Sequence, residues 1–218
     1  MDRTTTALRA AGHVDDSMSG LGPGSMVMTT DGELPVEWLA AGDRVITRDH
    51  GAQPLRGLVR QRNSAGDGAP LLPDPVTLGP RSDHTDTKPW DRLRLAPGHR
   101  VLVMNYALQL NFGLDEALAR PCDLTRRRIA RPDPELGQLT YHHLILARHE
   151  LILVGGIWVE STCPDIADSL GAALPKDSSA PLTQGNRRLA RPSLTSAEAA
   201  FLRHAMPQSL SLRELLAA

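Results

Sequence analysis

The sequence is poor in aromatic residues and in net charge, and each shortage excludes a class of partner. Aromatic residues make up 3% of the 218 residues, too few to form a platform on which nucleic-acid bases could stack. Lys and Arg number 24 against 25 Asp and Glu, and the formal net charge of -1 gives no field that would attract a polyanion or an anionic membrane surface. We therefore expect no nucleic-acid partner and no membrane partner.

Cysteines and long apolar runs are also scarce. The two cysteines, Cys122 and Cys163, are too few for a disulfide framework and too far apart for a CxxC metal site, so we interpret them as small buried or half-buried thiols. No run approaches the roughly 18 apolar residues of a membrane helix, and residues 1–20 contain no apolar stretch typical of a signal peptide. The default expectation is a cytoplasmic protein, while secretion without a cleaved N-terminal signal stays open.

Glycine and proline, in contrast, are abundant. The 18 Gly and 17 Pro are typical of a turn-rich β protein. Residues 20–48 show the pattern most clearly. Gly22-Pro23-Gly24 predicts a tight turn, residues 26–28 predict a short strand, and Asp31-Gly32 predicts a hairpin turn before a second apolar segment.

Residues 20–48 resemble the opening of the Hedgehog/intein (Hint) self-processing domain in its bacterial form. The matching positions are Pro23-Gly24-Ser25, Asp31-Gly32, Pro35-Val36-Glu37, Gly42-Asp43, Val45 and Thr47-Arg48. The family begins with a nucleophilic Cys, and Gly20 stands at that position here. The resemblance implies an all-β, Hint-type fold with a small helical C-terminal segment, but it leaves the implied activity without its nucleophile.

The resemblance also implies three candidate catalytic histidines, His99, His143 and His149. In the family, a His polarises the peptide bond before the nucleophile and a Thr helps to hold the scissile amide; His99 matches that His, whereas Ala96 replaces the Thr. The later block matches at Tyr141, His143, His149-Glu150, Gly155-Gly156 and Glu160-Ser161. A structural interpretation of His99, in which it caps a strand and satisfies a backbone carbonyl, competes with the catalytic one.

Two classes of function follow. Hint chemistry is an N-to-S acyl shift, which Gly20 cannot start because it has no side chain, and a hydroxyl at Ser19 or Ser25 would need a strong base and a strained amide. The first hypothesis is therefore a degenerate Hint module that lacks autoprocessing and acts as a binding or structural domain. The second is an autocatalytic domain that cuts near Ser19-Gly20 through an unrecognised nucleophile. The sequence leaves a protein partner open and does not indicate an oligomeric state.

Other chemistry finds weaker support. A zinc site could be formed by His99, His142 or His143, and His149, but the spacing of these residues is not specific for zinc. His149-Glu150 resembles the start of a metalloprotease HExxH motif, but the second His of that motif is missing. A hydrolase triad of Ser161, His149 and Asp165 has no nucleophile elbow around the Ser. We interpret His84 and its acidic neighbours, like the basic residues 126–128, as solvated loops. We expect no cofactor and no metal.

The chain divides into three predicted parts. Residues 1–19 are predicted as a flexible leader, 20–165 as the Hint-like β-domain, and 166–218 as a linker with a helical C-terminal segment. In the β-domain we predict a strand at 52–60, a loop or short hairpin at 61–89, a half-buried strand at 91–95 and a turn at 112–124. Residues 138–153 are predicted to form one bent strand or two shorter ones. In the C-terminal part we predict a helix after a capping box at Thr195 and a second helix at 210–216. We expect the apolar face of the C-terminal helices to cover an edge of the β-domain, with a docking role as the alternative.

Overall fold

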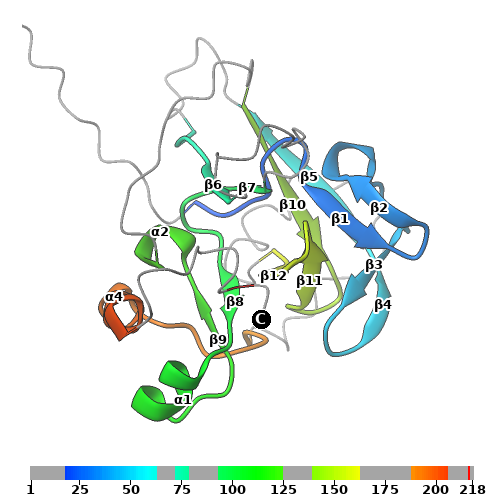
Figure 1. Ribbon diagram of the computed structural model, residues 1–218. Helices are drawn as coiled ribbons and strands as arrows, with labels where there is room; N and C mark the ends of the chain where they lie inside the picture. Colours follow the sequence, from blue (N-terminus) through cyan, green and yellow to red (C-terminus); the bar gives the residue numbers. More distant parts are fainter. Residues whose placement is uncertain are drawn as a thin grey trace, which may run out of the picture.

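The computed structural model describes residues 18–62, 72–78, 93–124, 139–162, 188–205 and 216, and within them the fold is mostly antiparallel β-sheet (Figure 1). The strands are β1 (Met26–Thr29), β2 (Gly32–Pro35), β3 (Arg44–Thr47), β4 (Gly51–Pro54), β5 (Gly57–Arg62), β6 (Val76–Leu78), β7 (Leu93–Leu95), β8 (Val101–Val103), β9 (Ala117–Ala119), β10 (Thr140–Ile145), β11 (Leu151–Val154) and β12 (Ile157–Glu160). The helices are η1 (Val36–Trp38), α1 (Tyr106–Phe112), α2 (Pro121–Leu124) and α4 (Ser196–Ala205). The prediction of an all-β fold with a small helical C-terminal segment is confirmed.

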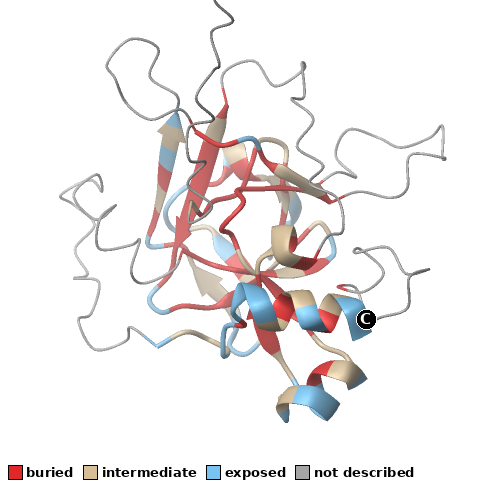
Figure 2. Ribbon diagram, turned by 90° about the vertical axis from the view of Figure 1, so that its left-hand side faces the viewer, coloured by how far each residue is buried: buried red, intermediate tan, exposed pale blue. Residues whose placement is uncertain are grey.

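One large sheet and two small ones organise these strands. The eight-stranded sheet runs in the order β2-β1-β3-β11-β12-β8-β9, with β4 paired to β3, and β10-β5 and β6-β7 form separate two-stranded sheets. Figure 2 shows that the buried residues are concentrated in the interior of the molecule, while β2 and β4 contain none. The main core contains fully buried side chains from distant segments, among them Val27, Val101 and Ile152.

The opening hairpin forms as the sequence predicts. β1 and β2 pair from Met26 opposite Pro35 to Thr29 opposite Gly32, with the turn between them. Gly32 adopts a φ of 100° in that turn, a conformation that side chains disfavour. The hydroxyl of Thr29 donates to the carbonyl of Gly32 at 2.7 Å and closes the hairpin.

Three local predictions are wrong, each because tertiary contacts override the local pattern. The strand predicted at 52–60 is two strands, β4 and β5, since Leu55 is buried at a bend between them. Arg94 in β7 is 7% exposed rather than facing solvent, so the alternation at 91–95 does not mark a half-buried strand. The turn predicted at 112–124 contains β9 and the short helix α2.

Residues 138–153 form two strands, β10 and β11, which confirms one of the two predicted alternatives. β10 pairs with β5 along its whole length, from Thr140 opposite Arg62 to Ile145 opposite Gly57. β11 joins the large sheet instead and pairs with β12. The bend between β10 and β11 therefore moves the chain from one sheet to the other.

The predicted helix after Thr195 is present as α4. The Glu198 carboxylate accepts from the Thr195 backbone N–H at 2.7 Å, while the Thr195 hydroxyl accepts from the Glu198 N–H at 3.3 Å, which completes the capping box. Ala199 and Leu202 belong to the main core, and α4 packs against α2 and α1. Covering of a sheet edge by this helix stays a prediction. The second predicted C-terminal helix falls almost wholly outside the described residues.

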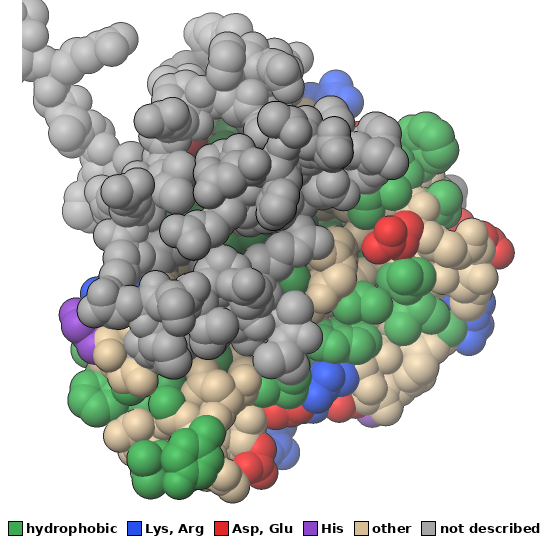
Figure 3. All heavy atoms as spheres, viewed as in Figure 1, with side chains coloured by type: hydrophobic (Ala, Val, Ile, Leu, Met, Phe, Trp, Pro, Cys, Tyr) green, Lys and Arg blue, Asp and Glu red, His purple; other side chains and the backbone are tan. Residues whose placement is uncertain are grey.

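Some large apolar side chains face solvent. Figure 3 shows hydrophobic side chains at the lower end of the molecule, where α1 lies. Tyr106 and Leu110 on this helix are 74% and 67% exposed, although Leu108 between them is buried. Among the described residues, no helix is long and apolar enough to cross a membrane.

Candidate functional site

Residues 18–22 pass between two strands and are held on both sides by backbone hydrogen bonds. Leu21 exchanges two bonds with His142 of β10, at 2.9 and 2.8 Å, and Gly22 donates to the Arg94 carbonyl of β7 at 2.7 Å. The Met18 carbonyl accepts from Gly98 at 2.7 Å. Ser19 is 3% exposed, so the end of the segment predicted as a leader lies inside the fold; residues 1–17 are outside the described part of the chain.

His99 faces the peptide bond between Ser19 and Gly20. Its Nδ1 atom lies 3.2 Å from the Gly20 backbone nitrogen and 2.8 Å from the Ser19 hydroxyl oxygen. Because a backbone N–H can only donate, Nδ1 is the acceptor, and the proton of the neutral imidazole is on Nε2. His99 therefore bonds to a backbone donor, not to a carbonyl as its structural interpretation assumed.

The imidazole of His99 is a weak base in this position. Burial lowers the pKa of His99 from 6.5 to about 4, so the ring is neutral at pH 7. Its Nε2 atom is buried and has no hydrogen-bond partner among the described residues. A neutral His99 can accept a proton at Nδ1, but it is not poised as an acid at neutral pH.

Gly20 has neither a side chain nor room for one. A Cβ built on Gly20 would lie 2.9 Å from the Cβ of Tyr141 and 3.4 Å from Cε1 of His143. The φ of Gly20 is 136°, a region that other residues rarely adopt. Both the contacts and the backbone conformation at this position thus favour glycine.

His143 is the second predicted histidine at this site. It lies on β10, is 3% exposed, and its Nε2 is 3.2 Å from the side-chain oxygen of Gln61 on β5. Burial lowers the pKa of His143 to about 4, with the neighbouring His99 acting in the same direction. The structure therefore places two buried, neutral imidazoles, His99 and His143, beside Gly20.

His149, the third predicted histidine, does not contact Gly20. Its Nδ1 accepts from the Ala190 backbone at 2.9 Å, and its Nε2 lies 3.2 Å from a Glu160 carboxylate oxygen. Glu160 also accepts from the Arg100 backbone N–H at 2.9 Å. Burial would raise the pKa of Glu160, but the hydrogen bond from His149 and the charge of Arg100 lower it. His149 thus fastens the C-terminal segment to the sheet.

The alternative sites are not assembled among the described residues. No group of three or more His, Cys, Asp or Glu side chains there is placed to hold a metal ion. The Ser161 hydroxyl accepts from the Glu150 backbone N–H at 2.9 Å, while the two ring nitrogens of His149 bond to Ala190 and Glu160. Asp165 lies outside the described residues. Ser25 donates its hydroxyl to the Gly22 carbonyl at 2.8 Å, which gives it a structural role.

The sequence gives no signal for the contacts that three further residues make at the site. Ser19 precedes the first residue of the Hint pattern, and its hydroxyl contacts His99. Gly98 lies in none of the patterns described above, and its N–H donates to the Met18 carbonyl. Ala96, which replaces the expected Thr, binds the Gly20 carbonyl through its backbone N–H at 2.9 Å, a contact that leaves no side-chain signal.

Comparison with known proteins gives one match. No curated protein and no solved structure matches the chain. The family model of the Hint domain matches residues 20–166, more than half of the chain, and begins at Gly20, the residue that faces His99. The chain therefore belongs to the Hint domain family.

Proposed function

We propose that this chain is a degenerate Hint domain that keeps the scaffold, does not process itself, and acts as a binding or structural module. Gly20 carries this proposal. An acyl shift at the Ser19–Gly20 bond needs a nucleophilic atom on residue 20, and Gly20 offers none. Because a Cβ there would lie 2.9 Å from the Cβ of Tyr141, the site has no place for a nucleophilic side chain without a shift of β10.

The remaining hydroxyl near the site cannot replace that nucleophile at the same bond. Ser19 could attack only the carbonyl before it, that of Met18, because attack on its own carbonyl would close a strained four-membered ring. Ser19 is also 3% exposed, which keeps out the water or thiol that would release a cleaved segment. Both points favour a stable chain.

One second candidate function rests on a specific observation. Ser19 Oγ lies 2.8 Å from His99 Nδ1, and Gly98 N–H donates to the Met18 carbonyl at 2.7 Å, where it would stabilise a developing oxyanion. In this reaction Oγ attacks the Met18 carbonyl carbon and gives its proton to His99. The bond from that carbon to the Ser19 nitrogen then breaks, the nitrogen takes the proton, and water hydrolyses the resulting ester.

Intact-mass measurement on the purified full chain separates the two functions. The protein is incubated at neutral pH with and without dithiothreitol or hydroxylamine, which release thioesters and esters. A degenerate domain keeps its full mass under all conditions. A break after Ser19 would contradict the proposal, and a break after Met18, recognised by one additional serine in the larger fragment, would establish the second candidate.

Two variants make a positive result interpretable. Ser19→Ala removes the alternative nucleophile and leaves the backbone unchanged, whereas His99→Asn keeps an acceptor near the position of Nδ1 but removes the base. Cleavage that both variants abolish would assign the reaction to Ser19 and His99. Cleavage that persists in both would point to a contaminating protease.

A further inference from the structure

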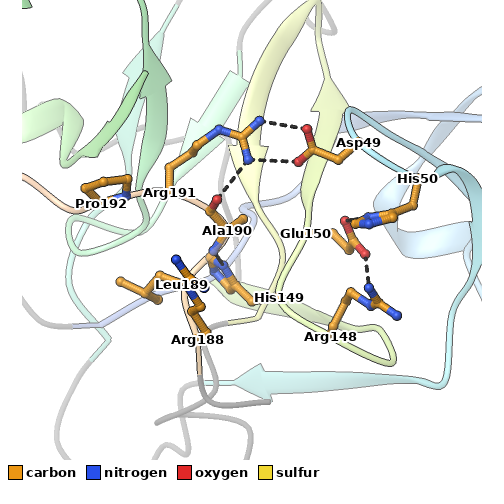
Figure 4. Close-up of a pocket in the computed structure, with 10 residues that line it drawn as sticks. All are labelled: Asp49, His50, Arg148, His149, Glu150, Arg188, Leu189, Ala190, Arg191 and Pro192. Carbon is orange, nitrogen blue, oxygen red and sulfur yellow. Dashed lines mark hydrogen bonds and ion pairs between the residues drawn. The ribbon is translucent and has the colours of Figure 1, made fainter. Parts of the chain in front are cut away.

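A second pocket lies away from His99, where three parts of the chain meet (Figure 4). It has a volume of about 510 Å³ and is formed by the turn between β3 and β4, the connection between β10 and β11, and residues 188–192. These segments are far apart in the sequence. The pocket therefore exists only because residues 188–192 are fixed against the sheet.

Arg191 fixes that segment. Its guanidinium donates to both Asp49 carboxylate oxygens, at 2.7 and 2.9 Å, and to Glu116. The hydrogen bond with Asp49 raises the pKa of Arg191, so its charge is permanent. Ala190 adds the backbone bond to His149. The wall of the pocket is thus built before any ligand arrives, which lowers the cost of binding.

The carboxylates in the pocket already have partners. Both oxygens of Asp49 are bound by Arg191. Glu150 is 2% exposed, with one oxygen 2.9 Å from His50 Nδ1 and the other 3.8 Å from Arg148. Neither carboxylate needs a bound cation to balance its charge.

The guanidinium groups of Arg148 and Arg188, in contrast, can still bind an anion. Arg188 is exposed and makes no ion pair or side-chain hydrogen bond within the part of the chain that the structure describes. The Arg148 side chain is 52% exposed, and its contact with Glu150 is long. Figure 4 shows both on the side of the pocket away from the pair of Arg191 and Asp49. Three Arg against two carboxylates leave the pocket with an excess of one positive charge.

We propose that this pocket, which Arg148 and Arg188 line, binds a small anion, a carboxylate or phosphate group. The planar guanidinium forms paired, charge-assisted hydrogen bonds with both groups. Leu189 and Pro192 line the same pocket and offer an apolar surface to the rest of such a molecule. This inference gives the binding role a ligand class, and it holds whether or not the chain cleaves itself.

Amide chemical shifts of the full-length protein test the proposal. The protein is titrated with sodium phosphate and, separately, with sodium acetate at pH 7.5, with sodium chloride adjusted to keep the ionic strength constant. We expect saturable shifts at the amides of His50, His149 and Ala190. Arg188→Gln and Arg148→Gln should each weaken binding by roughly tenfold, the effect of one lost charge-assisted contact.

Arg62→Gln is the matched control, since Arg62 is an exposed cation at the far end of β5 and does not line the pocket. Its binding should equal that of the wild type. Saturation with acetate alone would identify a carboxylate ligand, and saturation with phosphate alone a phosphate ligand. Shifts that fail to saturate with either anion, or equal weakening in Arg62→Gln, would overturn the proposal.

Discussion

Mild acid should destabilise the folded protein through the two buried histidines beside Gly20. Burial lowers the pKa values of His99 and His143 from 6.5 to about 4. Between these pH values the unfolded chain binds protons that the folded chain does not, so the free energy of unfolding falls as the pH falls. The loss starts near pH 6.5 and levels off below pH 4.

The size of the loss follows from the same two pKa values. Lowering the pH from 7.5 to 5 should cost about 2 kcal/mol for each histidine and about 4 kcal/mol for both. His142, whose pKa is also lowered by burial, adds a loss of the same sign. Carboxylates contribute little in this range because their unfolded pKa values lie near 4.

Urea denaturation followed by circular dichroism at pH 7.5 and pH 5 gives both free energies of unfolding. In His99→Asn, the difference between the two pH values should shrink by about 2 kcal/mol, since one titrating group is gone. Gln109→Asn, a non-titrating change at an exposed site on α1, should leave the difference unchanged. A wild-type loss below about 1 kcal/mol, or an unchanged loss in His99→Asn, would refute the reasoning.

Three further predictions concern the scaffold. Gly20→Ala should lower the free energy of unfolding by about 2 to 4 kcal/mol in urea titrations, because of its φ and the contact with Tyr141, whereas Gly42→Ala, with positive φ but open space, should cost only about 1 kcal/mol. Arg191→Ala should destabilise the protein by about 2 kcal/mol in thermal denaturation. Arg191→Lys should restore only part of this stability, because Lys cannot bridge Asp49 and Glu116. Equal stability of Arg191→Lys and wild type would contradict the bridging role. Thr195→Ala should speed amide hydrogen exchange in the first turn of α4 without changing exchange in β1, and unchanged exchange in α4 would show that the capping box is dispensable.

Local signals in the sequence predicted those parts of the fold whose causes are local. The Asp31-Gly32 turn, the strands around it and the capping box at Thr195 depend on residues a few positions apart. The bend between β4 and β5 and the burial of Arg94 depend on contacts with distant segments, since the Arg56 N–H donates to Ile145 and the Arg94 side chain donates to Pro23. No periodicity within the segment itself carries that information.

The residues of the candidate site also divide into those that the sequence predicts and those that depend on distant contacts. The match to the Hint pattern predicted His99 and His143 near Gly20, and both lie there. His149, predicted from the same pattern, does not contact Gly20, and its two ring nitrogens bond to Glu160 and Ala190. The contacts of Ser19 and Gly98 could not be predicted, because they depend on the path of residues 18–22 between β7 and β10.

The position of His99 does not by itself argue for catalysis. The N–H of Gly20 is buried, and leaving such a donor unpaired would cost about 1 to 3 kcal/mol, so an acceptor at this point stabilises the fold whether or not a reaction occurs. The neutral imidazole supplies that acceptor, and the Ser19 hydroxyl shares it. The structural need for His99 is therefore the same whether or not the chain processes itself. A catalytic role of His99 requires evidence that a covalent bond at this site is cleaved, and the buried hydrogen bond is not such evidence.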